Sequence, residues 1–186
     1  MFKKTNTMDL LKTNALQKIF IPAGNLHLTN KNLILWTTLG SCISVIFHHK
    51  PTKLTGMFHA QLPQRNESND KCFENCTIPC YLKDRELADT DYMYVSCSIK
   101  FMNNFFIKKN IIKSKIDVYM LGGASILNNE RKQLTVGDRN ILVAEQHLSD
   151  YPIAGKHVGG TNGRSVFFNT STGVLEIKTV PNSNLG

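Results

Sequence analysis

Residues 32–62 read NLILWTTLGSCISVIFHHKPTKLTGMFHAQL and contain three runs rich in β-branched and aromatic residues. The runs cover 32–38, 42–48 and 56–62, and turn-forming residues separate them. Short apolar runs between Gly, Pro, Asn and Lys residues are typical of β-strands. The second and third runs flank the sequence HKPTK at 49–53, so their pairing as a hairpin would bring their outer ends together.

Similar runs outside this stretch extend the predicted sheet. KIFIP at 18–22 is one strand, and IDVYM at 116–120 is a buried strand that leads into two glycines. The runs at 165–169 and 174–179 flank a turn-rich connection, which favours a second hairpin.

Two helices are expected between these strand-rich ends. The first covers about 84–109, with acidic residues in its first turn and two lysines at its end, and the second covers 138–149. Apolar residues recur at helical spacing in both, namely Leu87, Met93, Ile99, Met102 and Phe106 in the first and Ile141, Leu142 and Leu148 in the second. Together, these strands and helices predict one α+β domain of mixed strands with two main helices.

Length and composition set the organisation of the chain. Its 186 residues suit one domain, and the 41% hydrophobic content argues against a disordered protein. We interpret 1–16 as a flexible N-terminal extension and 17–186 as the domain. Within the domain, 64–83 is polar, carries three cysteines and is interpreted as a surface loop. The default oligomeric state is a monomer.

Charge and targeting signals narrow the class of protein. Lys and Arg number 22 against 14 Asp and Glu, a net charge of +8, which suits an acidic protein partner. A block of basic residues, zinc-finger spacing and an RNP-like motif are missing from the sequence, so nucleic-acid binding is not expected. An apolar run of about 18 residues and a secretory signal are also missing, so we expect no membrane insertion and a cytoplasmic location. The odd number of five cysteines fits a reducing compartment.

Cys42 and His59 form the pattern that suggests chemistry. Cys42 lies where a glycine-containing turn meets a strand, and His59 lies 17 residues later in the next run, so a hairpin would bring them close together. A free thiol has a pKa of about 8.5 and needs a base, whereas an imidazole can take its proton, hold the thiolate as an ion pair and later protonate a leaving amine. A buried strand cysteine is also a common inert hydrophobe, and a strand histidine is commonly structural.

Three residues before the cysteine can assist this pair. Thr37 can orient the imidazole through its hydroxyl or its carbonyl group. Gly40 and Ser41 are small, so backbone N–H groups can approach a developing oxyanion, where one donor is worth about 3 kcal/mol.

Six sequence blocks, in the same order, resemble the CheD family of chemoreceptor glutamine deamidases over about residues 19–180. They are Thr37-Thr38-Leu39-Gly40-Ser41-Cys42, Gly56-Met57-Phe58-His59-Ala60-Gln61-Leu62-Pro63, Ala88-Asp89-Thr90, Gly122-Gly123-Ala124, Val136-Gly137-Asp138-Arg139-Asn140 and Gly159-Gly160-Thr161-Asn162-Gly163-Arg164. The resemblance implies Cys42 as nucleophile, His59 as base and Thr37 as the assisting residue. It also implies a layered α/β/β fold related to bacterial toxin deamidases.

The resemblance further implies the reaction. A protein-glutamine glutaminase hydrolyses glutamine side-chain amides of methyl-accepting chemotaxis receptors to glutamate, releases ammonia through a thioester and so tunes chemotactic signal transduction. It needs no metal or organic cofactor, and its implied partners are the receptor's cytoplasmic helical bundle and a CheC-type phosphatase. The alternatives are a cysteine deamidase that acts on another protein and a regulatory binding partner of such a phosphatase.

Two further motifs have open interpretations. Cys72, Cys76 and Cys80 form C-x3-C-x3-C, which departs from the usual family pattern and from zinc-ligand spacing. We interpret them as an exposed thiol cluster, with a metal site or redox sensor as the alternative, and predict no metal. The glycine-rich block near the C-terminus allows tight turns beside the active site, and its predicted substrate-binding residues are Gly159, Gly160, Asn162 and Arg164. We expect the Arg164 side chain to contact backbone carbonyls or the substrate. Arg139 and Asn140 are interpreted as capping and loop-anchoring residues.

Overall fold

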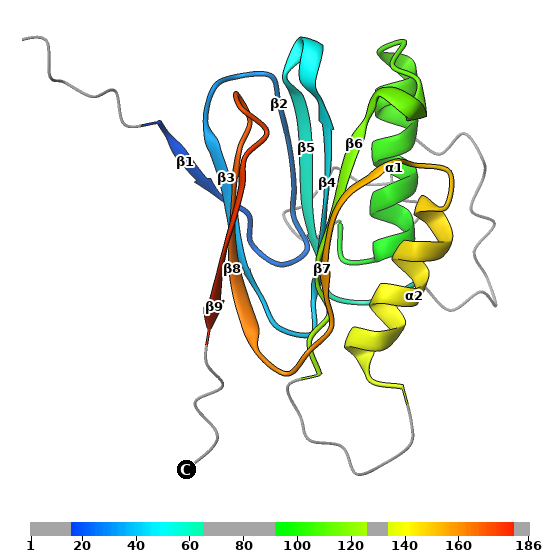
Figure 1. Ribbon diagram of the computed structural model, residues 1–186. Coiled ribbons are helices and arrows are strands. Elements are labelled where there is room, and N and C mark those ends of the chain that lie inside the picture. The colour runs from blue at the N-terminus through cyan, green and yellow to red at the C-terminus, as the bar shows by residue number, and fades with distance from the viewer. Residues whose placement is uncertain (1–15, 65–91, 126–133, 181–186) are drawn as a thin grey trace, which may run out of the picture.

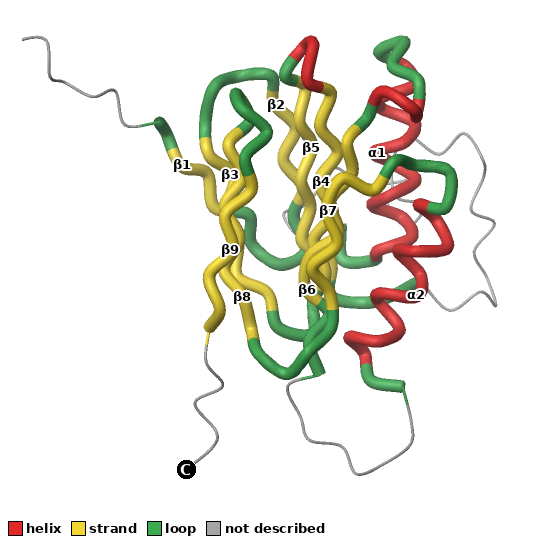
Figure 2. Tube along the Cα trace, in the orientation of Figure 1, coloured by secondary structure: helices red, strands yellow, loops and turns green. Residues whose placement is uncertain are grey.

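The computed structural model describes residues 16–64, 92–125 and 134–180. Figure 1 shows three layers, in which two helices cover one face of a central sheet and a second sheet covers the other face. Figure 2 shows the same arrangement by type of structure, with the two long helices on one side of the sheets and a short helical turn at the tip of a hairpin. The described residues therefore form a layered α+β fold, as predicted.

The central sheet has five strands in the order β2-β5-β4-β6-β7. Their bounds are Leu26–Thr29 (β2), Leu54–Ala60 (β5), Ile43–His49 (β4), Asp117–Gly122 (β6) and Ile153–Val158 (β7). The outer sheet has the order β1-β3-β8-β9, with bounds Lys18–Phe20 (β1), Ile34–Leu39 (β3), Gly163–Asn169 (β8) and Leu175–Val180 (β9). Strand pairs β1–β3 and β6–β7 are parallel and the other pairs are antiparallel. Both predicted hairpins, β4–β5 and β8–β9, are confirmed.

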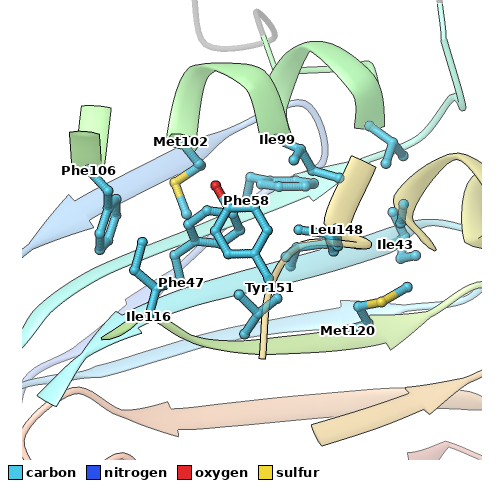
Figure 3. Close-up of a cluster of buried hydrophobic side chains, with 14 of the residues drawn as sticks. Ile43, Phe47, Phe58, Ile99, Met102, Phe106, Ile116, Met120, Leu148 and Tyr151 are labelled. Atoms are coloured by element: carbon cyan, nitrogen blue, oxygen red, sulfur yellow. The ribbon is translucent and has the colours of Figure 1, made fainter. Parts of the chain in front are cut away.

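Strand β4 has a nearly continuous apolar sequence because both of its faces are buried. Ile43, Val45 and Phe47 face the helices, whereas Ile46 packs between the two sheets. Figure 3 shows the cluster under the helices, where Phe47 and Phe58 lie against Met102 and Phe106. Gly56 in β5 permits this close packing, since a Cβ atom there would lie 2.4 Å from the Met102 side chain.

The first helix, α1 (Val95–Lys108), begins later than predicted. Residues 92–94 are not helical because they bond to Gly24 and to the two residues that follow β5. The amides of Gln61 and Leu62 donate to the Met93 carbonyl, and Leu62 forms a β-bridge with Tyr94, which holds this segment extended. The first part of the predicted helix, 84–91, lies outside the described residues.

The second helix, α2 (Val136–Leu148), begins two residues before its predicted start. Thr135 is its N-cap, and the Thr135 and Asp138 side chains form a reciprocal capping box. The predicted capping role of Arg139 and Asn140 is therefore wrong, because both lie inside the helix.

Strands β2 and β7 were not predicted. Both are edge strands. Strand β2 has only four residues, and β7 is largely exposed and contains Gly155 and Lys156, so neither stands out as an apolar run. Almost all of the predicted extension (1–16) and loop (64–83) lies outside the described residues, including Cys72, Cys76 and Cys80. In the described part of the chain, neither helix is long and apolar enough to cross a membrane.

Candidate active site

Cys42 and His59 lie at one end of the β4–β5 hairpin. The register places His59 opposite Ser44, and Cys42 precedes β4 by one residue. Cys42 therefore lies diagonally across from His59 on the same face of the hairpin, where Cα atoms are about 7 Å apart. Cys42 packs against the hydrophobic cluster between the two sheets. The predicted hairpin forms, and its register sets Cys42 two residues away from the position directly opposite His59.

Thr37 reaches His59 from the facing sheet. Its hydroxyl oxygen lies 2.8 Å from His59 Nδ1, and both side chains are buried. Thr38, its exposed neighbour, points to the other face, where its hydroxyl lies 2.9 Å from that of half-buried Ser165. Of the two adjacent threonines, Thr37 is therefore the one that contacts the imidazole.

The Thr37 hydroxyl also determines which imidazole nitrogen carries the proton. It donates its only proton to the Ile21 carbonyl oxygen at 2.7 Å, so towards His59 it can act only as an acceptor. His59 Nδ1 lies 3.3 Å from the same carbonyl, which also favours an N–H group at Nδ1. Nε2 of the neutral ring is then unprotonated and can act as a base.

The backbone of His59 is anchored by two hydrogen bonds, and its second ring nitrogen is unpaired. The His59 carbonyl accepts from the Gly24 amide at 2.7 Å, and its amide donates to the Asn25 carbonyl at 2.9 Å. Nε2 is buried and makes no hydrogen bond to any described residue. Burial lowers the pKa of His59, opposed in part by the hydrogen bond to Ile21, so the neutral ring is favoured at neutral pH.

The loop that carries Cys42 is anchored to the end of β6. The Gly123 amide donates to the Cys42 carbonyl at 2.7 Å, and the Ala124 amide donates to the Gly40 carbonyl at 2.8 Å. Gly122 makes this contact possible, because its φ is +106° and a Cβ atom there would lie 2.3 Å from the Cys42 carbonyl oxygen. The sequence block Gly122-Gly123-Ala124 thus supports the candidate nucleophile.

The surroundings of Cys42 favour the protonated thiol. Burial raises the pKa of the Cys42 thiol, although a hydrogen bond from its own backbone amide opposes this effect. Together with the lowered pKa of His59, this favours a neutral thiol and imidazole at rest over the ion pair that the sequence suggested.

Alkylation of Cys42 should therefore be slow at neutral pH. Because the thiolate reacts and its pKa is raised, the rate constant for iodoacetamide should rise about tenfold per pH unit from pH 6 to beyond pH 8.5. Mass spectrometry of the Cys42 peptide, with free cysteine as reference, measures this rate. A plateau between pH 5 and 7 would indicate a resting ion pair and contradict the expectation.

Replacing Thr37 with valine should lower kcat about 10- to 100-fold. Valine has a similar shape but cannot accept from Nδ1–H, so the ring loses its orientation and its preferred tautomer. Thr37→Ser keeps the hydroxyl and should stay within about threefold of the original kcat, as should Thr38→Val on the opposite face. Steady-state kinetics and melting curves of the three variants test this, and equal activity of the valine and serine variants at position 37 would refute it.

Asn140 is a site residue whose place the sequence did not reveal. It is fully buried in α2, and its Nδ2 group donates to the carbonyls of Ser41 and Gln61, at 3.0 Å each. Ser41 precedes Cys42 and Gln61 follows His59 by two residues, so Asn140 ties both segments to the helix layer. The loop-anchoring part of its predicted role is confirmed. Its position in the block Val136–Asn140 was the feature of the sequence that could have indicated a place near the site.

The glycine-rich block near the C-terminus borders the Cys42 loop. The Gly159 amide donates to the Gly122 carbonyl at 2.9 Å, and the Ser125 amide donates to the Gly160 carbonyl at 2.8 Å. Figure 1 shows the β3–β4 and β7–β8 connections at the same end of the sheets. The Arg164 guanidinium donates to the carbonyls of His157 and Gly159, so the expected contact with backbone carbonyls is confirmed.

A cavity of about 400 Å³ lies beside this block. Asn162 and Arg164 line it together with Gly160 and Thr179. Burial lowers the pKa of the Arg164 guanidinium. Within the described ranges, no group of three or more His, Cys, Asp or Glu side chains could hold a metal ion.

The family model and the relatives that match this chain all belong to one family. A family model described as CheD chemotactic sensory transduction matches residues 80–179. A "Probable chemoreceptor glutamine deamidase CheD" of Oleidesulfovibrio alaskensis is 30% identical over 175 residues, which cover 90% of this chain and 75% of the relative. A relative of the same name in Nitratidesulfovibrio vulgaris is 31% identical over 88% of this chain and 77% of its own length.

A third relative, "Probable chemoreceptor glutamine deamidase CheD 2" of Geobacter sulfurreducens, is 28% identical over 88% of this chain and 90% of its own length. The family model begins after Cys42 and His59, whereas a match over 90% of the chain must include both residues. The similarity therefore extends through the candidate active site as well as the C-terminal half, and the chain belongs to the CheD family.

Proposed function

We propose that this protein hydrolyses glutamine side-chain amides of chemoreceptors to glutamate and releases ammonia. The observation that carries the proposal is the buried chain from the Ile21 carbonyl through Thr37 to His59, which leaves Nε2 of His59 free on the face that carries Cys42. Similarity to proteins named chemoreceptor glutamine deamidase supports the choice of substrate.

In the proposed mechanism His59 Nε2 takes the proton of the Cys42 thiol as sulfur attacks the carboxamide carbon. The tetrahedral intermediate collapses when the C–N bond breaks and His59 returns the proton to nitrogen, so ammonia leaves and a thioester remains. Water then attacks the thioester carbon and gives a proton to His59. The C–S bond breaks, the thiolate regains a proton and glutamate is released.

Backbone donors are proposed to stabilise the oxyanion in both steps. The Cys42 amide already lies against its own sulfur, and the Gly40 and Ser41 segment is held by the hydrogen bonds from Ala124 and Asn140. Donors that are fixed before the reaction stabilise developing charge at no cost of reorganisation.

The substrate is proposed to dock across the same end of the two sheets. Gly159, Gly160, Asn162 and Arg164 would contact the receptor there, supported by the adjoining cavity and by the hydrogen bonds between this block and the Cys42 anchor. The net charge of +8 favours an acidic helical bundle as partner.

Further parts of the proposal follow from the family. A CheC-type phosphatase is proposed to bind at the same face, and the protein is proposed to act in the cytoplasm as a single catalytic domain over 17–186. The layered fold is proposed to be related to that of the bacterial toxin deamidases, which the α/β/β arrangement supports.

A substrate panel tests the proposed class of substrate. Ammonia release should be measured with a cognate receptor cytoplasmic fragment, with its glutamine-to-asparagine variant and with an unrelated glutamine-rich helical protein. Release from the receptor fragment alone is expected. Faster release from the unrelated protein would support a deamidase with another substrate, and binding of a phosphatase without any release would support a regulatory role.

A further inference from the structure

The buried polar atoms that lack a partner are concentrated at the candidate active site. Among the described residues these side-chain atoms are Ser44 Oγ, His59 Nε2 and Asn140 Oδ1. Buried polar groups are normally hydrogen-bonded, and leaving one unpaired costs about 1–3 kcal/mol. Nε2 belongs to His59, the proposed base, and Asn140 holds the loop of Cys42 through Nδ2 although its Oδ1 stays unpaired. The Ser44 hydroxyl makes no hydrogen bond to any described residue.

Ser44 adjoins both proposed catalytic residues. It lies directly opposite His59 in the β4–β5 register, and it follows Cys42 by two residues, so all three share one face of the hairpin. Cβ atoms of directly opposite residues are about 5 Å apart. The Ser44 side chain is completely buried. Its hydroxyl therefore lies on the buried face of the hairpin that also carries His59 and Cys42.

We propose that Ser44 is a further catalytic residue, which positions the water that hydrolyses the thioester. This inference rests on the deamidase function proposed above. The water donates one proton to His59 Nε2 and the other, as a hydrogen bond, to Ser44 Oγ. When both water protons are hydrogen-bonded in this way, a lone pair of the water oxygen points at the thioester carbon, which is bonded to the Cys42 sulfur.

The atoms balance through this step. The water oxygen forms a bond with the acyl carbon, one water proton moves to His59 Nε2, and the C–S bond breaks to leave a thiolate. The imidazolium returns its proton to sulfur, which restores the neutral pair. Ser44 keeps its own proton and remains a hydrogen-bonding partner throughout.

The two half-reactions depend on Ser44 to different degrees. During acylation the carboxamide nitrogen is held by the covalent structure of the bound substrate, so its position does not require the serine. The water that follows is held only by hydrogen bonds, and poor orientation of a reactant can cost about 10²-fold. Loss of the Ser44 hydroxyl should therefore slow deacylation selectively.

The test compares the unaltered protein with Ser44→Ala and with Ser98→Ala on a receptor fragment. Ser98 is also a completely buried serine, but it lies in α1 and bonds to the carbonyls of Tyr92 and Tyr94. For Ser44→Ala we expect a burst of about one ammonia per enzyme, a kcat lowered about 10- to 100-fold and an unchanged kcat/KM. Intact-protein mass spectrometry should show the receptor fragment attached to the enzyme.

Hydroxylamine provides a second readout, because this stronger nucleophile attacks thioesters without an oriented water. It should restore turnover of Ser44→Ala, with hydroxamate as product, and should leave Ser98→Ala unaffected. Ser44→Gly also lacks the hydroxyl and replaces the alanine variant if that variant does not fold.

Other outcomes would overturn the inference. An unchanged kcat, or an equal fall in kcat and kcat/KM without an accumulated adduct, would show that Ser44 does not act in deacylation. Failure of the unaltered protein to release ammonia from the receptor fragment would instead refute the proposed function itself.

Discussion

Replacing Cys42 with alanine should abolish ammonia release, with a fall in kcat of at least about 10⁴-fold. The thioester cannot form without sulfur, and the oxyanion donors alone retain only a small part of the catalysis. Cys42 is only partly buried and the side chain becomes smaller, so the variant should fold and bind receptor. The measurement is ammonia release with enzyme in excess over the receptor fragment, which would detect even a single slow turnover.

Cys97→Ala is the matched control. Cys97 is the other cysteine among the described residues, and it is buried near the start of α1, in the helix layer. It should retain full activity, although it can lose stability. A Cys42→Ala rate within tenfold of the original would exclude Cys42 as the nucleophile.

Replacing His59 with asparagine should lower kcat about 10³-fold. Asparagine can still donate a hydrogen bond towards Thr37 but has no counterpart of Nε2, so the base is lost while its support remains. The pH profile of kcat/KM should also change. In the unaltered protein the acidic limb reflects protonation of His59, and because burial lowers its pKa, that limb should lie below pH 6.5. The variant should lack it.

His48→Asn is a close control for this change. His48 is also a buried strand histidine, its Nδ1 lies 2.9 Å from the Thr55 hydroxyl, and burial lowers its pKa as well. It lies near the opposite end of the hairpin, beside the 3₁₀ turn Lys50–Thr52. His48→Asn should keep its kcat and its acidic limb. A similar loss in both variants would show that removal of any buried histidine disturbs the fold.

The hairpin was predictable because its signals are local. Two apolar runs and a turn-forming segment at 49–53 suffice to pair β4 with β5, and the same pairing places Cys42 and His59 at one end. The start of α1 was not predictable, because the extended Met93 and Tyr94 depend on contacts with residues 61–62, which follow β5 and are distant in sequence. Edge strand β7 was missed because its exposed residues carry little apolar pattern.

The sequence allowed the reactive side chains of the site to be predicted, because their chemistry depends on residue type. Cys42, His59 and Thr37 could be chosen from pattern and family resemblance. The Ile21 carbonyl, which determines the protonation of His59 through Thr37, is a backbone group and leaves no mark on the sequence. Burial likewise raises the pKa of the Cys42 thiol and lowers the pKa of the His59 imidazole, and burial depends on the packing of the two sheets.

Peptide mapping of a receptor cytoplasmic fragment treated in H₂¹⁸O shows directly whether the protein hydrolyses receptor glutamines through Cys42. Hydrolysis replaces an amide by an acid and takes its oxygen from water, so a modified glutamine should gain about 3 Da in H₂¹⁸O and about 1 Da in ordinary water. We expect this gain at specific receptor glutamines with the unaltered protein and none with Cys42→Ala. An unmodified receptor, or a gain that persists without Cys42, would contradict the account.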